Sequence, residues 1–393
     1  MINKNSISII GGAGHVGFPL GLAFADKKFK VNLIDLNKEN LEIIKSGNVP
    51  FYEIGAKKIL KNCLKKKLIT TTNDLKTVKK SKYIIVCIGT PIDSKLKPET
   101  KTFLIFFKKL LKYVNKDQLI IIRSSVYPGI IDEIGKFYKK RKNNIVYCPE
   151  RIVQSKSLVE LSKLPQIVSG FDTKNLNLAK KLFAKICGKI IETSILEAEL
   201  IKLFSNANRY INFSIANQLY IICNHFNLDF KRIRKIMRDG YERNLNLSNS
   251  GFTAGPCLLK DTMQLTSFYK KKFDLGFAAM KVNESLPDLI IKKLSKIKNV
   301  KNKKIGLLGL AFKAETDDIR DSLSIKLLKK LKNKKYKVFQ SDEYYKDSKN
   351  INAKLLIKKS DVIILGAPHK RYKKLKISNK KKLIDVWGFF KTS

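Results

Sequence analysis

The sequence has few acidic residues for its length, and this shortage dominates its composition. Its 393 residues include 33 Asp and Glu against 80 Lys and Arg, which gives a formal net charge of +47. Such an excess raises binding to nucleic acid or to a membrane surface as a hypothesis. The lysines, however, form short scattered runs such as LKKKLI and YKKRKNN, in a chain that is also rich in Ile and Asn. We therefore interpret most of the excess as compositional and expect neither nucleic acid nor membrane as a partner.

Long apolar runs and a signal sequence are lacking as well. No apolar run approaches the roughly 20 residues that span a bilayer. The first residues, MINKNSISIIGGAG, lack the apolar core and cleavage site of a signal peptide. We expect a cytoplasmic protein. Disulfides and a metal site are not expected in a reducing cytosol, because the cysteines show no metal-type spacing and lie at 63, 87, 148, 187, 223 and 257.

Apolar strands alternate with helical segments at both ends of the chain. SISII (6–10), KVNLIDL (30–36) and three later runs up to residue 150 predict strands, and four more follow after residue 304. Alternation of this kind is typical of doubly wound parallel sheets. Between them, residues 196–226 predict one long helix without Gly or Pro. The expected fold is therefore α/β, with two Rossmann-like domains at 1–195 and 296–393 joined by a helical dimerisation domain at 196–295.

The first strand runs directly into a glycine-rich loop. Its sequence, GAGHVG, fits the G-x-G-x-x-G pattern that places a pyrophosphate at a helix N-terminus. An acid follows the second strand, 18 residues after the last glycine, where a carboxylate binds the ribose hydroxyls and repels a 2′-phosphate. The order of these features predicts NAD binding by Gly12, Gly14, Val16, Gly17 and Asp35.

Two other segments carry candidate catalytic groups. On the predicted long helix, Glu199, Lys202 and Asn206 are spaced at i, i+3 and i+7. A solvated stripe is the simpler interpretation, but the apolar surroundings suggest burial, where Lys and Asn could stabilise an oxyanion. In GFTAGPCLLKDTMQL (251–265), Cys257 stands at a predicted helix start near Lys260, which favours its thiolate. The alternative is a small residue that fills a turn.

The two predicted sites complement one another chemically. A nicotinamide cofactor removes hydride from an alcohol, and a cysteine can trap the resulting aldehyde as a thiohemiacetal. A second hydride transfer gives a thioester, and hydrolysis then gives an acid. A dinucleotide site and an activated thiol in one chain thus indicate a four-electron oxidation.

The sequence resembles the nucleotide-sugar dehydrogenases, the family of UDP-glucose 6-dehydrogenase and the UDP-N-acetylmannosamine dehydrogenases. The resemblance covers nearly the whole chain and rests on ordered motifs: GGAGHVG, CIGTP, RSSVYPG, CPERI, AELIKLFSNA, GPCLLKD, LGLAFKAETDDIRDS and IDVWG. It implies that the N-terminal domain binds NAD and that the C-terminal domain binds a UDP-sugar. A homodimer is implied as well.

The resemblance also implies roles for individual residues. Cys257 matches the nucleophile, Lys202 and Asn206 the oxyanion stabilisers, Asp261 an acid–base or water-positioning group, and Glu150 the glutamate of thioester hydrolysis. Further positions that match NAD contacts are Thr90, Ser125, Lys260 and Arg320. Positions that match substrate contacts are Arg151, Gln154, Lys202, Arg243, Gly255 and Lys313, of which Arg243 would reach the substrate of a neighbouring subunit.

Some residues depart from the pattern of the UDP-glucose enzymes. Gln154 stands where those enzymes commonly carry a second glutamate, and Gln cannot act as a base. CPERI, followed by LPQIVSG, looks more like the N-acetylhexosamine branch, so a UDP-N-acetylhexosamine is the expected substrate and UDP-glucose the alternative. More distant alternatives are a two-electron hydroxyacid-type dehydrogenase, which would need no Cys257, and a basic nucleic-acid-binding protein built on Rossmann folds.

Overall fold

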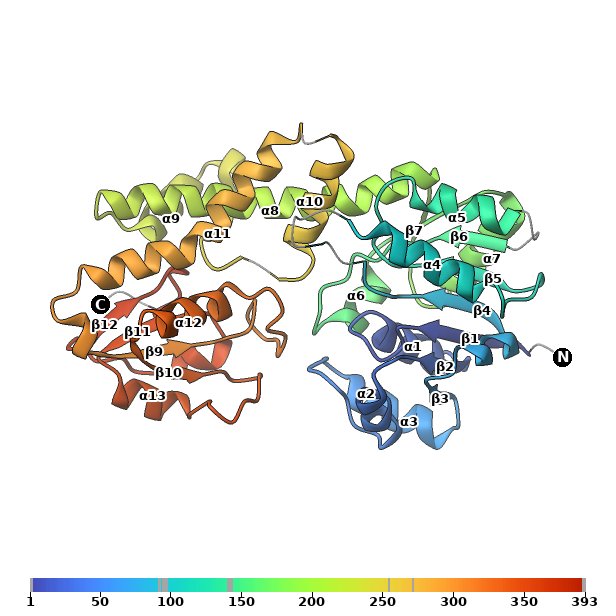
Figure 1. The fold of residues 1–393 in the computed structure, drawn as a ribbon, viewed down its shortest axis with the longest axis horizontal. Coiled ribbons are helices and arrows are strands. Elements are labelled where there is room, and N and C mark those ends of the chain that lie inside the picture. Colours follow the sequence, from blue (N-terminus) through green and yellow to red (C-terminus); the bar gives the residue numbers. More distant parts are fainter. Residues whose placement is uncertain are drawn as a thin grey trace. The chain divides into compact units, whose positions relative to one another are not determined.

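The computed structural model describes residues 3–90, 93, 98–139, 144–253, 255–270 and 272–390. It divides into two compact units, Met1–Phe204 and Ser205–Ser393. Each unit contains a sheet with helices on both of its faces (Figure 1). Pro91, the last residue of the CIGTP motif, lies outside the described residues.

The first unit contains an eight-stranded sheet in the order β3-β2-β1-β4-β5-β6-β7-β8. All neighbouring strands are parallel except β6 and β7. Its strands are β1 (Asn3–Ile10), β2 (Lys30–Ile34), β3 (Ile69–Thr72), β4 (Ser81–Val86), β5 (Leu119–Ile122), β6 (Asn144–Tyr147), β7 (Gln166–Gly170) and β8 (Ile190–Glu192). The strand order from β3 to β6 is the 3-2-1-4-5-6 order of dinucleotide-binding domains.

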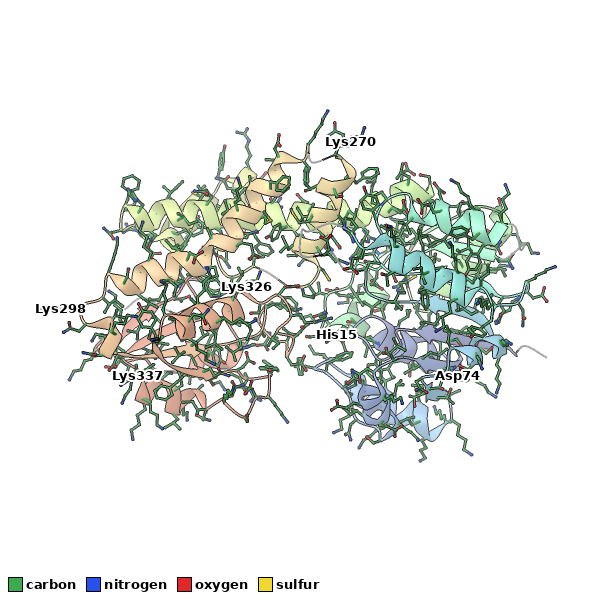
Figure 2. All side chains as sticks on the ribbon, in the orientation of Figure 1. His15, Asp74, Lys270, Lys298, Lys326 and Lys337 are labelled. Carbon is green, nitrogen blue, oxygen red and sulfur yellow. The ribbon has the colours of Figure 1, made fainter. Side chains whose placement is uncertain are left out.

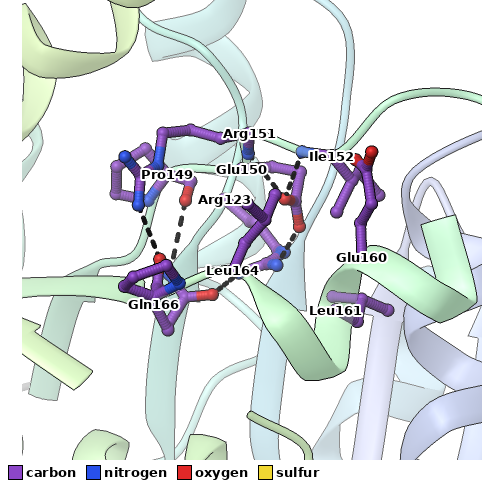
Figure 3. Close-up of a pocket in the computed structure, with 10 residues that line it drawn as sticks. Arg123, Pro149, Glu150, Arg151, Ile152, Glu160, Leu161, Leu164 and Gln166 are labelled. Carbon is purple, nitrogen blue, oxygen red and sulfur yellow. Dashed lines mark hydrogen bonds and ion pairs between the residues drawn. The ribbon is translucent and has the colours of Figure 1, made fainter. Parts of the chain in front are cut away.

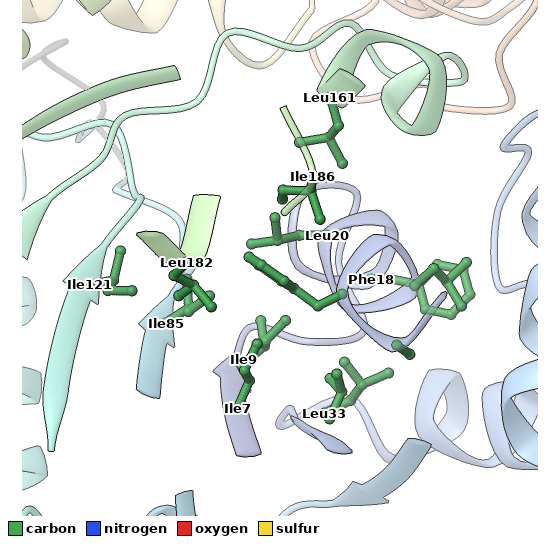
Figure 4. Packing of buried hydrophobic residues seen from close by; sticks show 14 of the residues in the cluster. Ile7, Ile9, Phe18, Leu20, Leu33, Ile85, Ile121, Leu161, Leu182 and Ile186 are labelled. Atoms are coloured by element: carbon green, nitrogen blue, oxygen red, sulfur yellow. The ribbon is translucent and has the colours of Figure 1, made fainter. Parts of the chain in front are cut away.

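Helices cover both faces of this sheet because its central strands are apolar on both sides. Leu119 and Ile121 of β5 belong to one buried cluster, and Ile120 and Ile122 belong to the other. Figure 4 shows the first cluster, in which strand side chains meet those of α1. The helices are α1 (Gly17–Asp26), α2 (Lys38–Lys45), α3 (Ala56–Lys65), η1 (Leu75–Lys80), α4 (Thr100–Leu110), α5 (Ile130–Lys139), α6 (Ser157–Lys163) and α7 (Thr173–Phe183).

The second unit contains a four-stranded parallel sheet in the order β10-β9-β11-β12. Its strands are β9 (Lys304–Leu308), β10 (Lys337–Ser341), β11 (Val362–Leu365) and β12 (Lys382–Ile384). Residues of α11 and α12 cover one face, and residues of α13 cover the other. The helices are α9 (Phe230–Arg238), η2 (Glu242–Asn244), α10 (Leu258–Phe268), α11 (Asp274–Ser295), η3 (Val300–Asn302), α12 (Leu323–Asn333), α13 (Ala353–Lys359) and η4 (Lys370–Lys374).

One helix belongs to both units. α8 (Ile195–His225) is 31 residues long, and the boundary between the units falls inside it, between Phe204 and Ser205. The predicted fold class and the predicted long helix are therefore confirmed. The predicted division into three domains at 195 and 295 stays a prediction.

Candidate active site

The loop between β1 and α1 needs glycine for its own packing at two of the three glycines of the G-x-G-x-x-G pattern. A Cβ at Gly12 would lie 2.7 Å from the carbonyl oxygen of Ile9, and one at Gly17 would lie 2.2 Å from that of Gly11. The packing of the protein itself thus requires glycine at Gly12 and Gly17. A Cβ at Gly14, in contrast, would meet no atom closer than 3.4 Å. Since packing does not explain Gly14, the lack of a side chain there suits the close approach of a ligand to the backbone.

Asp35 follows β2 beside this loop and suits a ribose. Its Oδ2 accepts a hydrogen bond from the Ala13 N–H at 3.0 Å, and its Oδ1 accepts one from the Asn37 N–H at 3.0 Å. A carboxylate has about four acceptor positions, and Asp35 is half-buried, so hydroxyl groups can bind there as well. The first turn of α1 has no acidic residue that would neutralise its positive end. These residues fit NAD, with the pyrophosphate at the loop and α1 and the adenosine ribose at Asp35.

Two other predicted cofactor residues meet at the same edge of the sheet. Thr90 follows β4, is 8% exposed, and donates through Oγ1 to the carbonyl oxygen of Ser125, which follows β5. β4 lies between β1 and β5, so the glycine loop, Thr90 and Ser125 all lie at the carboxyl ends of neighbouring strands. Ligands of doubly wound sheets bind at this edge, where the strand order reverses.

Cys257, in the second unit, has the surroundings of a nucleophile. It is exposed and occupies the N-cap of α10. The positive charges of Lys260 and Arg320 both interact with it. A helix N-terminus and neighbouring cations favour the thiolate. Two other cysteines lack this property, because burial raises the pKa of Cys87 and of Cys148 to about 12.

Asp261 lies one turn after Cys257 and joins two of the predicted site residues. Its side chain is 1% exposed, and its Oδ1 lies 3.2 Å from the Lys260 Nζ. Its Oδ2 accepts a hydrogen bond from the Asn206 Nδ2 at 2.6 Å. Burial opposes the charge of Lys260, but the carboxylate of Asp261 and the thiol of Cys257 outweigh it and raise the pKa of Lys260. The structure thus brings Asn206, Cys257, Lys260 and Asp261 into one cluster.

The loop after β9 adds Arg320 to the surroundings of Cys257 and also carries Lys313. A Cβ at Gly255, whose φ is +108°, would lie 2.5 Å from the ring of Phe312, so the segment before Cys257 packs against this loop. The Lys313 Nζ lies 5.8 Å from the centroid of the same ring. This close packing explains why glycine is needed at Gly255.

Arg320 is held by an acid that the sequence analysis did not single out. Its Nε donates to the Oδ1 of Asp318 at 3.0 Å, and its Nη2 donates to the Oδ2 at 2.6 Å. These hydrogen bonds raise the pKa of Arg320. The signal that could have identified Asp318 is its spacing, two residues before Arg320 in TDDIRDS.

Glu150 lies in a small pocket of the first unit, where it forms a buried ion pair (Figure 3). Arg123, which is 1% exposed, donates through Nη2 to the Glu150 Oε2. The Oε1 accepts the N–H groups of Arg151 at 2.6 Å and Ile152 at 2.8 Å. Through Oε1 the carboxylate holds the turn after β6, and through Oε2 it ties this turn to Arg123 at the end of β5. Arg123 was not predicted, although a charge that directly ends the apolar run LIIIR is a signal for such a partner.

The other predicted residues of this turn are half-buried. Arg151 donates through Nη2 to the carbonyl oxygen of Pro165 at 2.6 Å, and burial lowers its pKa. Gln154 lies just before Ser155, whose φ of 74° is in the left-handed region. Glu150 thus positions the segment that carries Arg151 and Gln154.

Lys202 is buried on α8, as predicted, with 9% of its surface exposed. One turn earlier, Glu199 accepts the N–H groups of Gly129 at 2.7 Å and Ile131 at 3.1 Å, and so fastens α8 to the start of α5. Burial raises the pKa of Glu199 to about 7. Glu199 therefore fixes the part of α8 that carries Lys202. The carboxyl group of Glu199 is itself costly to ionise, because it is buried.

The contacts of Arg243 are with its neighbour Tyr241. It is exposed in η2 and donates through Nη1 to the Tyr241 Oη at 3.2 Å, with its guanidinium over the same ring. The structure gives no contact of Arg243 with the Cys257 cluster among the interactions of the described residues.

The positive charges are distributed over many elements. Figure 2 shows Lys270, Lys298, Lys326 and Lys337 on separate segments of the second unit. In the first unit, the ring of His15 packs against that of Phe51, with centroids 4.0 Å apart.

Within the described ranges, no group of three or more His, Cys, Asp or Glu side chains could hold a metal ion. None of the helices in the part that the structure describes is both long and apolar enough to cross a membrane.

Comparisons with known proteins agree with the fold and the cofactor loop. Residues 5–187 match the NAD-binding domain of the UDP-glucose/GDP-mannose dehydrogenase family, residues 196–285 its central domain, and residues 306–392 its UDP-binding domain. The prediction of NAD as the cofactor is therefore confirmed.

Two curated relatives are similar over most of the chain. The UDP-N-acetyl-D-mannosamine dehydrogenase of Pyrococcus horikoshii is 26% identical over 376 residues, which cover 92% of this chain and 89% of the relative. The UDP-glucose 6-dehydrogenase of Rickettsia conorii is 26% identical over 386 residues, which cover 93% and 89%.

Two solved structures share the fold. The UDP-D-ManNAc dehydrogenase from Pyrococcus horikoshii has a TM-score of 0.89 at 24% identity and covers 99% of this chain and 96% of its own. A UDP-glucose dehydrogenase from Pyrobaculum islandicum has a TM-score of 0.87 at 19% identity, with coverages of 98% and 94%. With all three family domains matched in order, the chain belongs to the UDP-glucose/GDP-mannose dehydrogenase family.

Proposed function

We propose that the chain oxidises the C6 alcohol of a UDP-N-acetylhexosamine to a carboxylate, with two NAD consumed per sugar. The observation that carries the proposal is Cys257, an exposed thiol at a helix start that interacts with two cations. A two-electron dehydrogenase has no use for such a thiol. Relatives named UDP-N-acetyl-D-mannosamine dehydrogenase, at 25% to 27% identity, support the N-acetylated sugar.

Cys257 would carry the covalent chemistry. Bound NAD supplies the hydride acceptor for each of the two oxidations. The Cys257 thiolate adds to the aldehyde carbon and forms a thiohemiacetal, whose oxidation leaves a thioester. Water then attacks the thioester carbon, the C–S bond breaks, and the carboxylate and the thiolate are released. Because the aldehyde stays bound to sulfur, it does not escape between the two oxidations.

The other candidate catalytic residues would divide the remaining tasks. Lys202 and Asn206 would stabilise the negative charge on the reacting oxygen. The buried contact between Asn206 and Asp261 uses one amide hydrogen, and the amide has a second. Asp261 would position water or move a proton. Glu150, whose Oε1 accepts two N–H groups of the turn after β6, would take part in hydrolysis of the thioester.

The further roles follow the family resemblance. The proposed NAD contacts are Gly12, Gly14, Val16, Gly17, Asp35, Thr90, Ser125, Lys260 and Arg320. The proposed substrate contacts are Arg151, Gln154, Lys202, Arg243, Gly255 and Lys313. The proposed domains are 1–195 for NAD, 196–295 for dimerisation and 296–393 for the UDP-sugar.

We also propose a cytoplasmic homodimer that binds no nucleic acid. Ile215 and Ile222 of α8 are 47% and 46% exposed, and such apolar side chains on a helix surface suit a contact between subunits.

The test is NADH formation with UDP-N-acetylmannosamine, UDP-N-acetylglucosamine, UDP-N-acetylgalactosamine and UDP-glucose. We expect turnover with an N-acetylated sugar and two NADH for each sugar consumed. The Cys257→Ala variant is the control and should not form the acid. A clear preference for UDP-glucose would replace the proposed substrate, and the absence of turnover with every UDP-sugar would refute the proposed function.

A further inference from the structure

The second unit contains a buried Asp–His pair that has no role in the proposed reaction. The Nε2 of His369 lies 3.2 Å from the Oδ2 of Asp342, and neither side chain is exposed. On the other side of the ring, the Glu315 N–H donates to Nδ1 at 3.0 Å. Since Nδ1 accepts a hydrogen bond, the ring proton belongs on Nε2, which donates to Asp342. His369 therefore links the end of β10 to the loop after β9.

Asp342 occupies the place in this unit that Asp35 occupies in the first. Each acid follows the second strand of its sheet and accepts N–H groups from the loop after the first strand. Asp35 is half-buried and accepts two backbone hydrogen bonds, whereas the Asp342 side chain is 0% exposed. The donors to Asp342 are His369 and the N–H groups of Leu310, Ala311, Tyr344 and Tyr345. Asp342 is thus enclosed by protein donors and serves to brace the loop.

Glu315 shows that this loop is held in a conformation it would not otherwise adopt. Its φ is 56°, in the left-handed region that non-glycine residues rarely occupy. Its Oε1 accepts the Lys370 N–H at 2.8 Å, and its Oε2 accepts the Tyr344 Oη at 2.9 Å. Strained backbone of this kind persists only where the surroundings enforce it. His369, Lys370 and Tyr344 provide that enforcement.

The braced loop lies where a ligand of this sheet would bind. β9 and β11 are neighbours at the point where the strand order reverses, and ligands bind at the carboxyl ends of the strands there. The loops after these strands are packed backbone to backbone, since a Cβ at Gly309 would lie 2.5 Å from the Ala367 nitrogen. The loop after β9 carries Lys313, two residues before Glu315.

We propose that His369 is a positioning residue for the substrate: through Nδ1 it fixes the loop 309–322 so that Lys313 meets the uridine diphosphate. The inference rests on the proposed function, which makes Lys313 a substrate contact. His369 itself touches neither the substrate nor the cofactor.

Two amide substitutions separate the two hydrogen bonds of the ring. In His369→Asn, the amide oxygen takes the place of Nδ1 and can still accept the Glu315 N–H, while the donor to Asp342 is lost. In His369→Gln, the amide nitrogen takes the place of Nε2 and can still donate to Asp342, while the acceptor for Glu315 is lost. His225→Gln, at an exposed histidine near the end of α8, is the matched control.

The measurement is the affinity of the full chain for UDP and for NAD by titration calorimetry. We expect His369→Gln to raise the UDP Kd about tenfold, because the partly buried Glu315 N–H loses the acceptor that fixes the loop. His369→Asn should stay close to the unmodified protein, and the NAD Kd should be unchanged in both variants. KM for the UDP-sugar should rise in His369→Gln with little change in kcat.

Tyr344→Phe provides a second route to the same loop, because it removes only the hydroxyl that donates to Glu315. It should weaken UDP binding less than His369→Gln does, and it decides the matter if His369→Gln fails to fold. Unchanged UDP affinity in folded His369→Gln, or in Tyr344→Phe in its place, overturns the inference and leaves the proposed function intact. Equal losses of UDP and NAD affinity would also overturn it. Failure of the unmodified protein to bind UDP would overturn both.

Discussion

Glu199 should make the stability of the protein depend on pH. The carboxyl group is 1% exposed, and burial raises its pKa from 4.5 to about 7, against the effect of hydrogen bonds from Gly129 and Ile131. The folded chain therefore binds this proton more tightly than the unfolded chain. The stability that Glu199 contributes is complete below pH 4.5 and is lost as the pH rises through about 7. At about 1.4 kcal/mol for each pH unit between the two values, the loss amounts to about 3 kcal/mol.

Glu199→Gln removes this ionisation and nearly preserves the shape of the side chain. We expect the free energy of unfolding of the variant, relative to the unmodified protein, to rise by about 3 kcal/mol between pH 4.5 and pH 7.5. Urea unfolding followed by circular dichroism at several pH values measures this difference. Glu197→Gln on the same helix is the control: Glu197 is exposed, and hydrogen bonds from Thr193 and Ser194 lower its pKa to about 2. A difference between Glu199→Gln and the unmodified protein that stays constant with pH would refute the reasoning.

Three further predictions concern the reaction. Asp35→Ala should narrow the preference for NAD over NADP, because the carboxylate repels a 2′-phosphate; equal use of both cofactors by the unmodified protein would contradict this. Lys202→Ala should lower turnover by a factor of roughly 10² to 10³, because one oxyanion donor is lost. A near-normal rate would show that Lys202 has only a structural role. Cys257→Ser should accumulate an acyl-enzyme visible by mass spectrometry, because an oxygen ester is hydrolysed more slowly than a thioester; a yield of one NADH per sugar in the unmodified enzyme would exclude the covalent route.

The central strands could be predicted from the sequence because they are apolar on both faces. β4 and β5 lie in the middle of the first sheet, and their segments YIIV and LIII read as continuous apolar runs. The sequence analysis missed β3, β7 and β8, and two of these carry weaker signals. β3 (ITTT) lies at one edge of the sheet, and β8 (IIE), with only three residues, lies at the other. An edge strand buries less surface, so its sequence is less constrained.

The residues of the candidate site also differ in how well the sequence alone predicts them. Gly14, Asp35 and Cys257 could be predicted because their chemistry depends on neighbours close in the chain, at the end of a strand or the start of a helix. The partners that hold the site could not be predicted, because they are far apart along the chain. Gly129 and Glu199 are 70 residues apart, and their pairing exists only once α5 and α8 are folded together.

The course of α8 restricts how this protein can be divided or recombined. A fragment that ends at Phe204 would cut a 31-residue helix within its first third and leave carbonyl groups at the new end without their helical partners. Lys202 would then be on one fragment and Asn206 on the other. Chimeras made to exchange sugar specificity between relatives should therefore keep α8 whole, with junctions in loops such as the one between α9 and α10.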